Sequence, residues 1–277
     1  NKIWNAGRYI LLTIPLGTPI TPPEKVHSEL AQWLLHGLND LIRHSQTGLE
    51  AHRLSDVVDS LRSFFWGEFC DWYLEMDKKP ERTDEDNQVL AYSYSTLLKL
   101  MHPYVPFVTE ALWEQFKQPK MLAVSEWPQE LSYSFSESHN RIELLREAIS
   151  QIRTLREKAN IGLDKKIGAT LDSEKNAELF RTHQNLIIRL ARLSELEINE
   201  KTPDSSRDNL GVYFNETLAS IEASAVDWKK EIESLQKKLK TESGFVEKSL
   251  KKLKNPGFLD KAPEKVIIEL RGKVAST

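Results

Sequence analysis

Residues 64–75 read Phe64-Phe65-Trp66-Gly67-Glu68-Phe69-Cys70-Asp71-Trp72-Tyr73-Leu74-Glu75, and this aromatic stretch decides the fold class. It lies within a longer run, 51–77, whose apolar residues recur every three or four positions: Leu54, Val57, Val58, Leu61, Phe65, Phe69, Trp72 and Met76. That period predicts a helix with one buried face. Aromatic rings also stack on nucleic-acid bases, but at helical spacing they are more often core. We therefore predict a mainly α protein.

Four more helices are predicted around this one. The first covers residues 1–14 and ends at Pro15, and Thr21-Pro22-Pro23-Glu24 has the pattern of a capping box that starts the second, which Gly48 ends. Residues 84–101 and a short segment after Pro106 supply the other two, with apolar positions at Leu90, Tyr94, Leu97, Leu98, Val108, Leu112 and Phe116. Five amphipathic helices with short connections predict a bundle over residues 1–118.

Residues 119–224 follow a different pattern. After a loop-like stretch, a helix is predicted through Ile142, Leu145, Ile149, Ile152 and Leu155. A strand at 167–171, a helix at 174–190 and short alternating runs at 195–199, 210–215 and 219–223 come next. This order predicts a small α+β unit behind a linker.

Residues 225–277 return to a helical pattern. Apolar residues fall near heptad positions, which Glu242 and Ser249 interrupt: Trp228, Ile232, Leu235, Leu239, Val246 and Leu253. Asn255-Pro256-Gly257 breaks the helix, and Pro263 opens a second one with Val266, Leu270 and Val274. Two helices with a short connection predict a C-terminal antiparallel two-helix coiled coil.

The charge is divided unevenly along the chain. The net charge is −3, yet residues 225–277 carry 13 Lys and Arg against 8 Asp and Glu. A basic end on an acidic body favours a polyanionic partner, although a solvated coiled-coil surface explains the lysines equally well. The lysines that we expect to contact an RNA backbone are Lys237, Lys240, Lys248, Lys251, Lys252 and Lys254.

Nothing in the sequence indicates a catalytic or metal site. A single cysteine, Cys70, excludes a disulfide or a cysteine-based zinc site within one chain, and no glycine-rich phosphate loop or nucleophile elbow occurs. Asp71 and Glu75 lie four residues apart, which favours a solvated helix face over an acid–base pair. Without an apolar run of about 18 residues, we expect no membrane span and a cytoplasmic protein. The absence of an initiator Met suggests part of a longer chain.

Several blocks together resemble a known family. They are Asn1-Lys2-Ile3-Trp4-Asn5-Ala6-Gly7-Arg8-Tyr9, residues 64–75, residues 97–113, Trp127-Pro128, Ile152-Arg153-Thr154-Leu155-Arg156 and Lys252-Leu253-Lys254-Asn255-Pro256-Gly257-Phe258-Leu259-Asp260-Lys261-Ala262-Pro263. In this order they are similar to the C-terminal half of bacterial-type valyl-tRNA synthetases, which are class I enzymes. The helical blocks also occur in isoleucyl and leucyl enzymes, whereas the last block is more specific. One departure is Ile161-Gly162-Leu163-Asp164, where the family often has a proline-rich turn.

The resemblance implies roles for the parts. The bundle would recognise the anticodon stem-loop, and the coiled coil would contact the outer corner of the L-shaped tRNA(Val). The family places anticodon contacts at the C-terminal end of the first helix and the following loop, about residues 8–18, which implies Arg8 and Thr13 here. Lys2 and Asn5 match the family's first block and are the other two candidates for anticodon binding. Valine activation with ATP and Mg²⁺, transfer to tRNA and editing would lie in other domains, because neither class I signature occurs in this chain. We expect no cofactor here, and a monomer.

Two alternatives stay open at this point. The chain can be a helical protein-interaction scaffold, in which the C-terminal hairpin pairs with another coiled coil. It can also be the corresponding region of an isoleucyl- or leucyl-tRNA synthetase.

Overall fold

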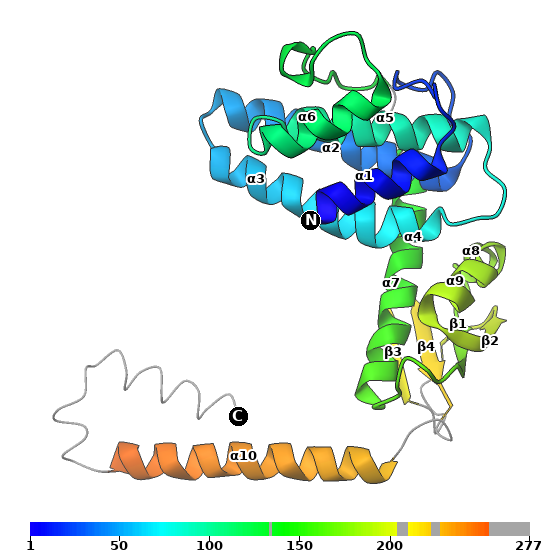
Figure 1. Ribbon diagram of the computed structural model, residues 1–277. Coiled ribbons are helices and arrows are strands. Elements are labelled where there is room, and N and C mark those ends of the chain that lie inside the picture. The colour runs from blue at the N-terminus through cyan, green and yellow to red at the C-terminus, as the bar shows by residue number, and fades with distance from the viewer. Residues whose placement is uncertain (133–134, 204–209, 223–227, 255–277) are drawn as a thin grey trace. The chain divides into compact units, whose positions relative to one another are not determined.

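The computed structural model describes residues 1–132, 135–203, 210–222 and 228–254, and it divides into two compact units (Figure 1). The first contains Asn1–Ile149 and Glu178–Ala191, and the second contains Ser150–Ala177 and Arg192–Thr277. The sequence-based division at residues 118 and 224 stays a prediction, because packing units and functional domains need not coincide.

The first unit is a bundle of helices, as predicted. Over residues 1–132 its elements are α1 (Lys2–Thr13), α2 (Glu29–Glu50), α3 (Leu54–Ser63), the π-helix η1 (Phe64–Tyr73), α4 (Leu74–Met76), α5 (Asp84–Met101), α6 (Pro106–Trp113) and the 3₁₀ turns η2 (Glu114–Phe116) and η3 (Leu122–Val124). Helix α3, the π-helix η1 and helix α4 follow one another without a break, so together they correspond to the single helix predicted at 51–77. The bundle and its mainly helical class are confirmed.

Buried aromatic side chains form the centre of this bundle. Phe65, Phe69, Tyr73 and Tyr94 are all under 2% exposed. The ring of Phe69 stacks on those of Phe65, Tyr73 and Tyr94, with centroids 5.9, 5.9 and 6.1 Å apart. Trp33 and Trp113 are buried as well, at 1% and 4% exposed. The aromatic stretch is therefore mainly core, and the interpretation of its rings as a base-stacking platform is wrong for the buried members.

The start of the second helix differs from its prediction. Helix α2 begins at Glu29, with Ser28 as N-cap, and not at Thr21-Pro22-Pro23-Glu24. The reason is a contact that the local sequence does not show: a carboxylate oxygen of Glu85, on α5, accepts the backbone N–H groups of His27 and Ser28, each at 3.0 Å. The helix also continues past Gly48, where an added Cβ would lie 2.4 Å from the Val57 side chain.

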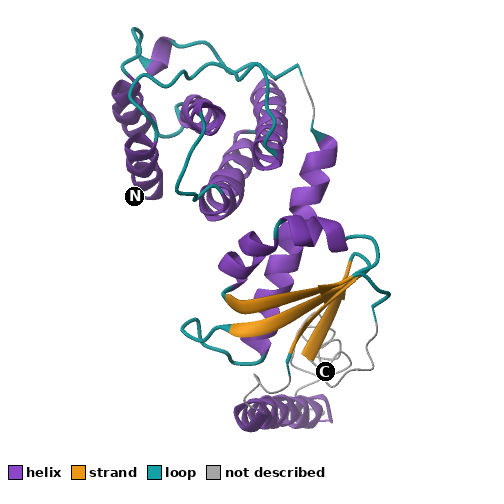
Figure 2. Ribbon diagram, turned by 90° about the vertical axis from the view of Figure 1, so that its right-hand side faces the viewer, coloured by secondary structure: helices purple, strands orange, loops and turns teal. Residues whose placement is uncertain are grey.

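The second unit contains a four-stranded mixed sheet (Figure 2). Strands β1 (Ile167–Asp172), β2 (Leu193–Asn199), β3 (Leu210–Phe214) and β4 (Thr217–Ile221) lie in the order β2-β1-β4-β3. Strand β1 pairs in parallel with β2, where Ala169 faces Leu196, and antiparallel with β4. Asn215 and Glu216, both at positive φ, make the two-residue hairpin between β3 and β4. The predicted α+β unit is confirmed.

Helices precede, interrupt and follow the sheet in the chain. Helix α7 (Ser136–Lys158) contributes residues to both units, and the predicted helix at 174–190 is two helices, α8 (Ala177–Thr182) and α9 (Gln184–Ala191), separated at His183. Helix α10 (Trp228–Lys254) confirms the first predicted helix of the C-terminal coiled coil. The predicted turn at Asn255-Pro256-Gly257 and the second helix of that hairpin lie outside the described residues.

Helix α1 packs very closely on the bundle at Gly7. A Cβ added there would lie 2.5 Å from both Leu112 Cδ2, on α6, and Tyr94 Oη, on α5. The Tyr94 hydroxyl donates a hydrogen bond to the Ile3 carbonyl at 3.1 Å, and Leu112 is 1% exposed, so neither group has free space to move into. This contact fixes α1, and with it the loop that follows α1.

We expect Gly7→Ala to destabilise the bundle by about 1–3 kcal/mol, because overpacking a filled core forces side chains out of their preferred rotamers. Gly67→Ala is the matched control, since an added Cβ there meets no atom within 4 Å. It should be neutral or slightly stabilising, because alanine favours helices. Urea unfolding followed by circular dichroism measures both, and equal midpoints for the two variants would contradict the packing argument.

Candidate nucleic-acid interface

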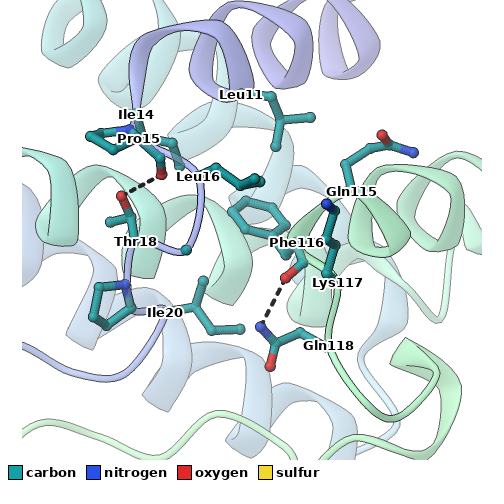
Figure 3. A pocket seen from close by; sticks show the side chains of 12 residues that line it. Leu11, Ile14, Pro15, Leu16, Thr18, Ile20, Gln115, Phe116, Lys117 and Gln118 are labelled. Atoms are coloured by element: carbon teal, nitrogen blue, oxygen red, sulfur yellow. Dashed lines mark hydrogen bonds between the residues drawn. The ribbon is translucent and has the colours of Figure 1, made fainter.

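The end of α1 and the turn after α6 enclose a pocket of about 330 Å³ (Figure 3). It is lined by two stretches of the chain: Leu11, Ile14, Pro15, Leu16, Gly17, Thr18, Pro19 and Ile20, and Gln115, Phe116, Lys117 and Gln118. Both stretches belong to the first unit. The loop after α1, where the resemblance implies anticodon contacts, forms one wall of this pocket.

The α1 side of the pocket has a defined backbone for local reasons. Ile14 leaves the helix in an extended conformation, and Pro15 has no N–H group with which to continue it. The Thr18 hydroxyl and N–H both donate to the Pro15 carbonyl, at 2.7 and 3.2 Å. Gly17 has a φ of +87°, which a glycine adopts without strain. These features hold the loop in a tight turn.

The opposite side is anchored to the bundle core. The Phe116 ring packs on the rings of Tyr94 and Trp113, with centroids 6.3 and 6.5 Å apart. Lys117 adopts a left-handed conformation (φ 50°), and Gln118 donates a side-chain hydrogen bond to the Phe116 carbonyl at 3.1 Å. Tyr94 therefore connects this side of the pocket to helix α1, because its hydroxyl also donates to the Ile3 carbonyl.

The lining suits a flat, partly apolar ligand with hydrogen-bonding edges. Leu16 is 81% exposed, and within the described part of the chain the N–H groups of Leu16 and Gly17 have no intramolecular acceptor. Lys117 adds an exposed cation. An unpaired RNA base offers an apolar face for stacking and acceptor atoms on its edge, so it matches these groups. A duplex would not fit, because its bases are already stacked and paired.

The residues predicted for the anticodon do not line this pocket. Lys2, Asn5, Arg8 and Thr13 spread over roughly 16 Å along α1, at 1.5 Å per residue. Asn5 and Arg8 are exposed, and the Thr13 hydroxyl donates to the Tyr9 carbonyl at 2.7 Å. That these four residues contact RNA stays a prediction. Sequence reasoning missed residues 115–118, because only folding brings them to the α1 loop.

Lys2 already has partners within the bundle. Its Nζ lies 2.6 Å from an Asp71 carboxylate oxygen and 6.0 Å from the centre of the Trp66 ring. Asp71 is 61% exposed at its side chain, so this ion pair stabilises the fold by at most about 1 kcal/mol. Lys2 can therefore exchange Asp71 for a phosphate at little cost.

A second, cation-rich hollow lies beside Thr13. It measures about 310 Å³ and is lined by Tyr9, Thr13, Asp77, Lys78, Lys79, Pro80 and Arg82. Arg82 holds the loop by contacts with the Asp77 carboxylate and, at 2.9 Å, with Asn87 Oδ1. Burial raises the pKa of Asp77, while Arg82 opposes that shift. Lys78 and Lys79 are exposed but paired with Glu75 and Asp86, each at 2.6 Å.

Helix α10 carries the other predicted contacts. Lys237, Lys240, Lys248, Lys251 and Lys252 are all exposed, and the Lys254 side chain lies outside the described atoms. At 100° per residue these five lysines fall within an arc of roughly 120°, opposite to Leu239 and Val246, on a helix about 40 Å long. One face of α10 is thus a row of cations. Ile232 and Leu239, at 52% and 66% exposed, leave the apolar seam partly open.

The described residues offer no sign of catalysis. They contain no group of three or more His, Cys, Asp or Glu side chains that can hold a metal ion. Asp71 and Glu75 are paired with Lys2 and Lys78, as expected for a solvated helix face. Burial raises the pKa of the Cys70 thiol to about 12, so this thiol is not an activated nucleophile. No helix in this part of the chain is long and apolar enough to cross a membrane.

Comparison with known proteins identifies the family to which the helical bundle belongs. The family described as the anticodon-binding domain of tRNA ligase matches residues 31–171, about half of the chain. The chain therefore belongs to the family of anticodon-binding domains of tRNA ligases. A second family, the valyl tRNA synthetase tRNA binding arm, matches residues 227–277, which include α10.

The relatives point to one kind of tRNA ligase. The chain is 30% identical over 293 residues to the valine–tRNA ligase of Geobacter sulfurreducens, covering 99% of this chain and 33% of that protein. It is 32% identical to the valine–tRNA ligase of Staphylococcus carnosus over 288 residues, covering 99% and 32%. The chain spans about a third of the length of these curated relatives and corresponds to their C-terminal part.

The Cys70 thiol should resist alkylation in the folded chain. Because a raised pKa keeps the thiolate a very minor species, the rate of reaction with iodoacetamide should stay far below that of an ordinary thiol throughout pH 7 to 9, although it should still rise about tenfold per pH unit. In urea, where the thiol regains its ordinary pKa of about 8.5, the rate should be much higher at every pH and should begin to level off near pH 9. Labelling followed by mass spectrometry measures both rates, and similar fast labelling in the two states would show that Cys70 is accessible.

Proposed function

We propose that this chain is the tRNA-recognition region of a valine–tRNA ligase and that its partner is tRNA(Val). The observation that carries the proposal is the pocket between the α1 loop and residues 115–118, which presents free backbone donors beside apolar walls within an anticodon-binding bundle. The second family match adds support, because it covers the helix with a row of lysines.

The two regions would divide the work as RNA-binding proteins usually do. Unpaired anticodon bases would be read at the pocket through stacking on apolar side chains and hydrogen bonds to the backbone N–H groups. The lysine row of α10 would hold the tRNA backbone by charge, which positions the RNA without reading its sequence. Lys2, Asn5, Arg8 and Thr13 would contribute along α1 at the edge of this surface.

The proposal leaves the ligase chemistry to other parts of the enzyme. Valine activation with ATP and Mg²⁺ and transfer to the tRNA would take place outside these residues, which supply no catalytic group in the described part. The chain would act as a monomer in the cytoplasm. An isoleucyl or leucyl enzyme stays the nearest alternative, and the choice of tRNA decides it.

Leu16→Asp tests the base-reading part of the proposal. Binding would be measured with a valine tRNA transcript and with the same transcript carrying a replaced anticodon, at two salt concentrations. The original chain should prefer the valine anticodon. The variant should lose that preference and bind about tenfold more weakly, because a carboxylate repels RNA and stacking on one base is worth about 1–3 kcal/mol.

Leu54→Asp is the matched control for this variant. Leu54 is 53% exposed and begins α3, where an acidic residue favours the helix N-terminus. It does not line the pocket. If both variants lose the anticodon preference equally, or if the original chain never shows one, base reading at this pocket is wrong. Binding of both transcripts by the original chain with equal affinity would leave only the α10 contact.

The row of lysines on α10 should control the salt dependence of binding. Replacing Lys240, Lys248 and Lys251 by Gln should lower the slope of log K against log salt by about 3, because each phosphate contact contributes about one. The anticodon preference should not change. Lys175→Gln is the control, since Lys175 is already paired with Glu216. An unchanged slope in the triple variant would remove α10 from the RNA contact.

A further inference from the structure

A group of exposed cations surrounds the loop between α7 and β1 in the second unit. Lys158 lies in the last turn of α7, Lys165 and Lys166 precede β1, and Arg192 precedes β2. All four side chains are exposed. The ammonium groups of the three lysines contact no carboxylate in the described part of the chain. The match to the anticodon-binding domain extends through this loop, but its description names no contact with RNA outside the anticodon.

A buried guanidinium holds these cations together. Arg156 is 3% exposed, and it donates hydrogen bonds to the carbonyl oxygens of Arg192, Gly162 and Lys165, at 3.0, 2.9 and 2.6 Å. Arg192 in turn donates to the Leu163 carbonyl at 2.9 Å. Hydrogen bonds from the two guanidinium groups to backbone carbonyl oxygens therefore fix the loop to both arginines. Lys165 and Lys166 belong to that loop.

The arrangement leaves like charges close together. Neither Arg156 nor Arg192 forms an ion pair in the described structure. The pKa of Arg156 is lowered by burial and by the charge of Arg192, and Asp164 only partly offsets this. Glu157 and Glu195 are exposed nearby in the sequence but pair with none of these cations. Bringing these cations together with only Asp164 to offset their charge opposes folding, and a bound polyanion would relieve that repulsion.

The side chains of this loop favour phosphate over bases. Its stretch Asn160–Lys166 contains no aromatic ring on which a base can stack, and its exposed apolar side chain is Leu163. Lysine and arginine without stacking partners neutralise phosphates and carry no direct sequence information. The chemistry therefore matches an RNA backbone.

We propose that the α7–β1 loop, with Lys165, Lys166 and Arg192, is a second RNA contact that binds the phosphodiester backbone of the tRNA outside the anticodon loop. This inference rests on the proposed function, which supplies the tRNA. It adds a contact that is separate in the chain from the pocket of the first unit and from the lysine row of α10.

Helix stability does not explain the two lysines that the proposal depends on most. Lys158 favours the negative end of α7 and so has a structural role without RNA. Lys165 and Lys166 lie beyond that helix, and their ammonium groups form no hydrogen bond or ion pair within the described structure. Replacing them should therefore leave the stability of the chain unchanged, which makes them the right pair to change.

Lys165→Gln with Lys166→Gln tests the proposal in the full 277-residue chain. Binding to the valine tRNA transcript should keep its anticodon preference, while the salt slope should fall by about 2. Hydroxyl-radical footprinting should show loss of backbone protection at a site outside the anticodon loop. Lys175→Gln is the control, and its slope and footprint should match those of the original chain.

The outcomes separate this proposal from the proposed function. If the original chain prefers the valine anticodon but the double variant keeps the original slope and footprint, the loop contact is wrong and the anticodon assignment stands. If the variant loses protection only inside the anticodon loop, the loop contact is also overturned. If the original chain binds neither transcript, both proposals fail. Urea midpoints of the variants confirm that folding is unchanged.

Discussion

The close packing of α1 against α5 and α6 at Gly7 is the contact on which the candidate site depends. Tyr94 hydrogen-bonds the α1 backbone at Ile3 and packs against Phe116, so one buried phenol joins the helix to the opposite wall of the pocket. Any side chain larger than hydrogen at position 7 would displace that helix or these two groups. The shape of the pocket thus depends on packing at Gly7, which is not one of the residues that line it.

Local pattern predicted much of the fold and little of the site. The apolar pattern located α5 and β1 closely, because Leu90, Tyr94 and Leu97 form the buried face of one and buried and half-buried residues alternate along the other. The predicted start of α2 was wrong. The Glu85 carboxylate accepts the Ser28 N–H group at the observed start, and Glu85 lies on α5, which no local pattern connects to Ser28. The lining at Phe116 and the backbone contacts of Arg156 were missed for the same reason: long-range packing places them.

The features that suit base recognition and the features that suit phosphate binding lie in different parts of the chain. The first unit offers a pocket with apolar walls and free backbone donors, which suits base recognition. Helix α10 offers cations in a row, and the α7–β1 loop offers cations gathered around a buried arginine. An acidic body with localised basic surfaces would repel RNA except at those surfaces. Specificity and affinity would then be set by different residues, which single substitutions can separate.

The most direct test of the central claim is photo-crosslinking of the chain to valine tRNA that carries 4-thiouridine in its anticodon loop. Mass spectrometry of the crosslinked peptides would locate the contact without any substitution in the protein. The account predicts crosslinks to residues 11–20 or 115–118, which line the pocket. Crosslinks confined to the second unit or to α10 would contradict base reading by the bundle.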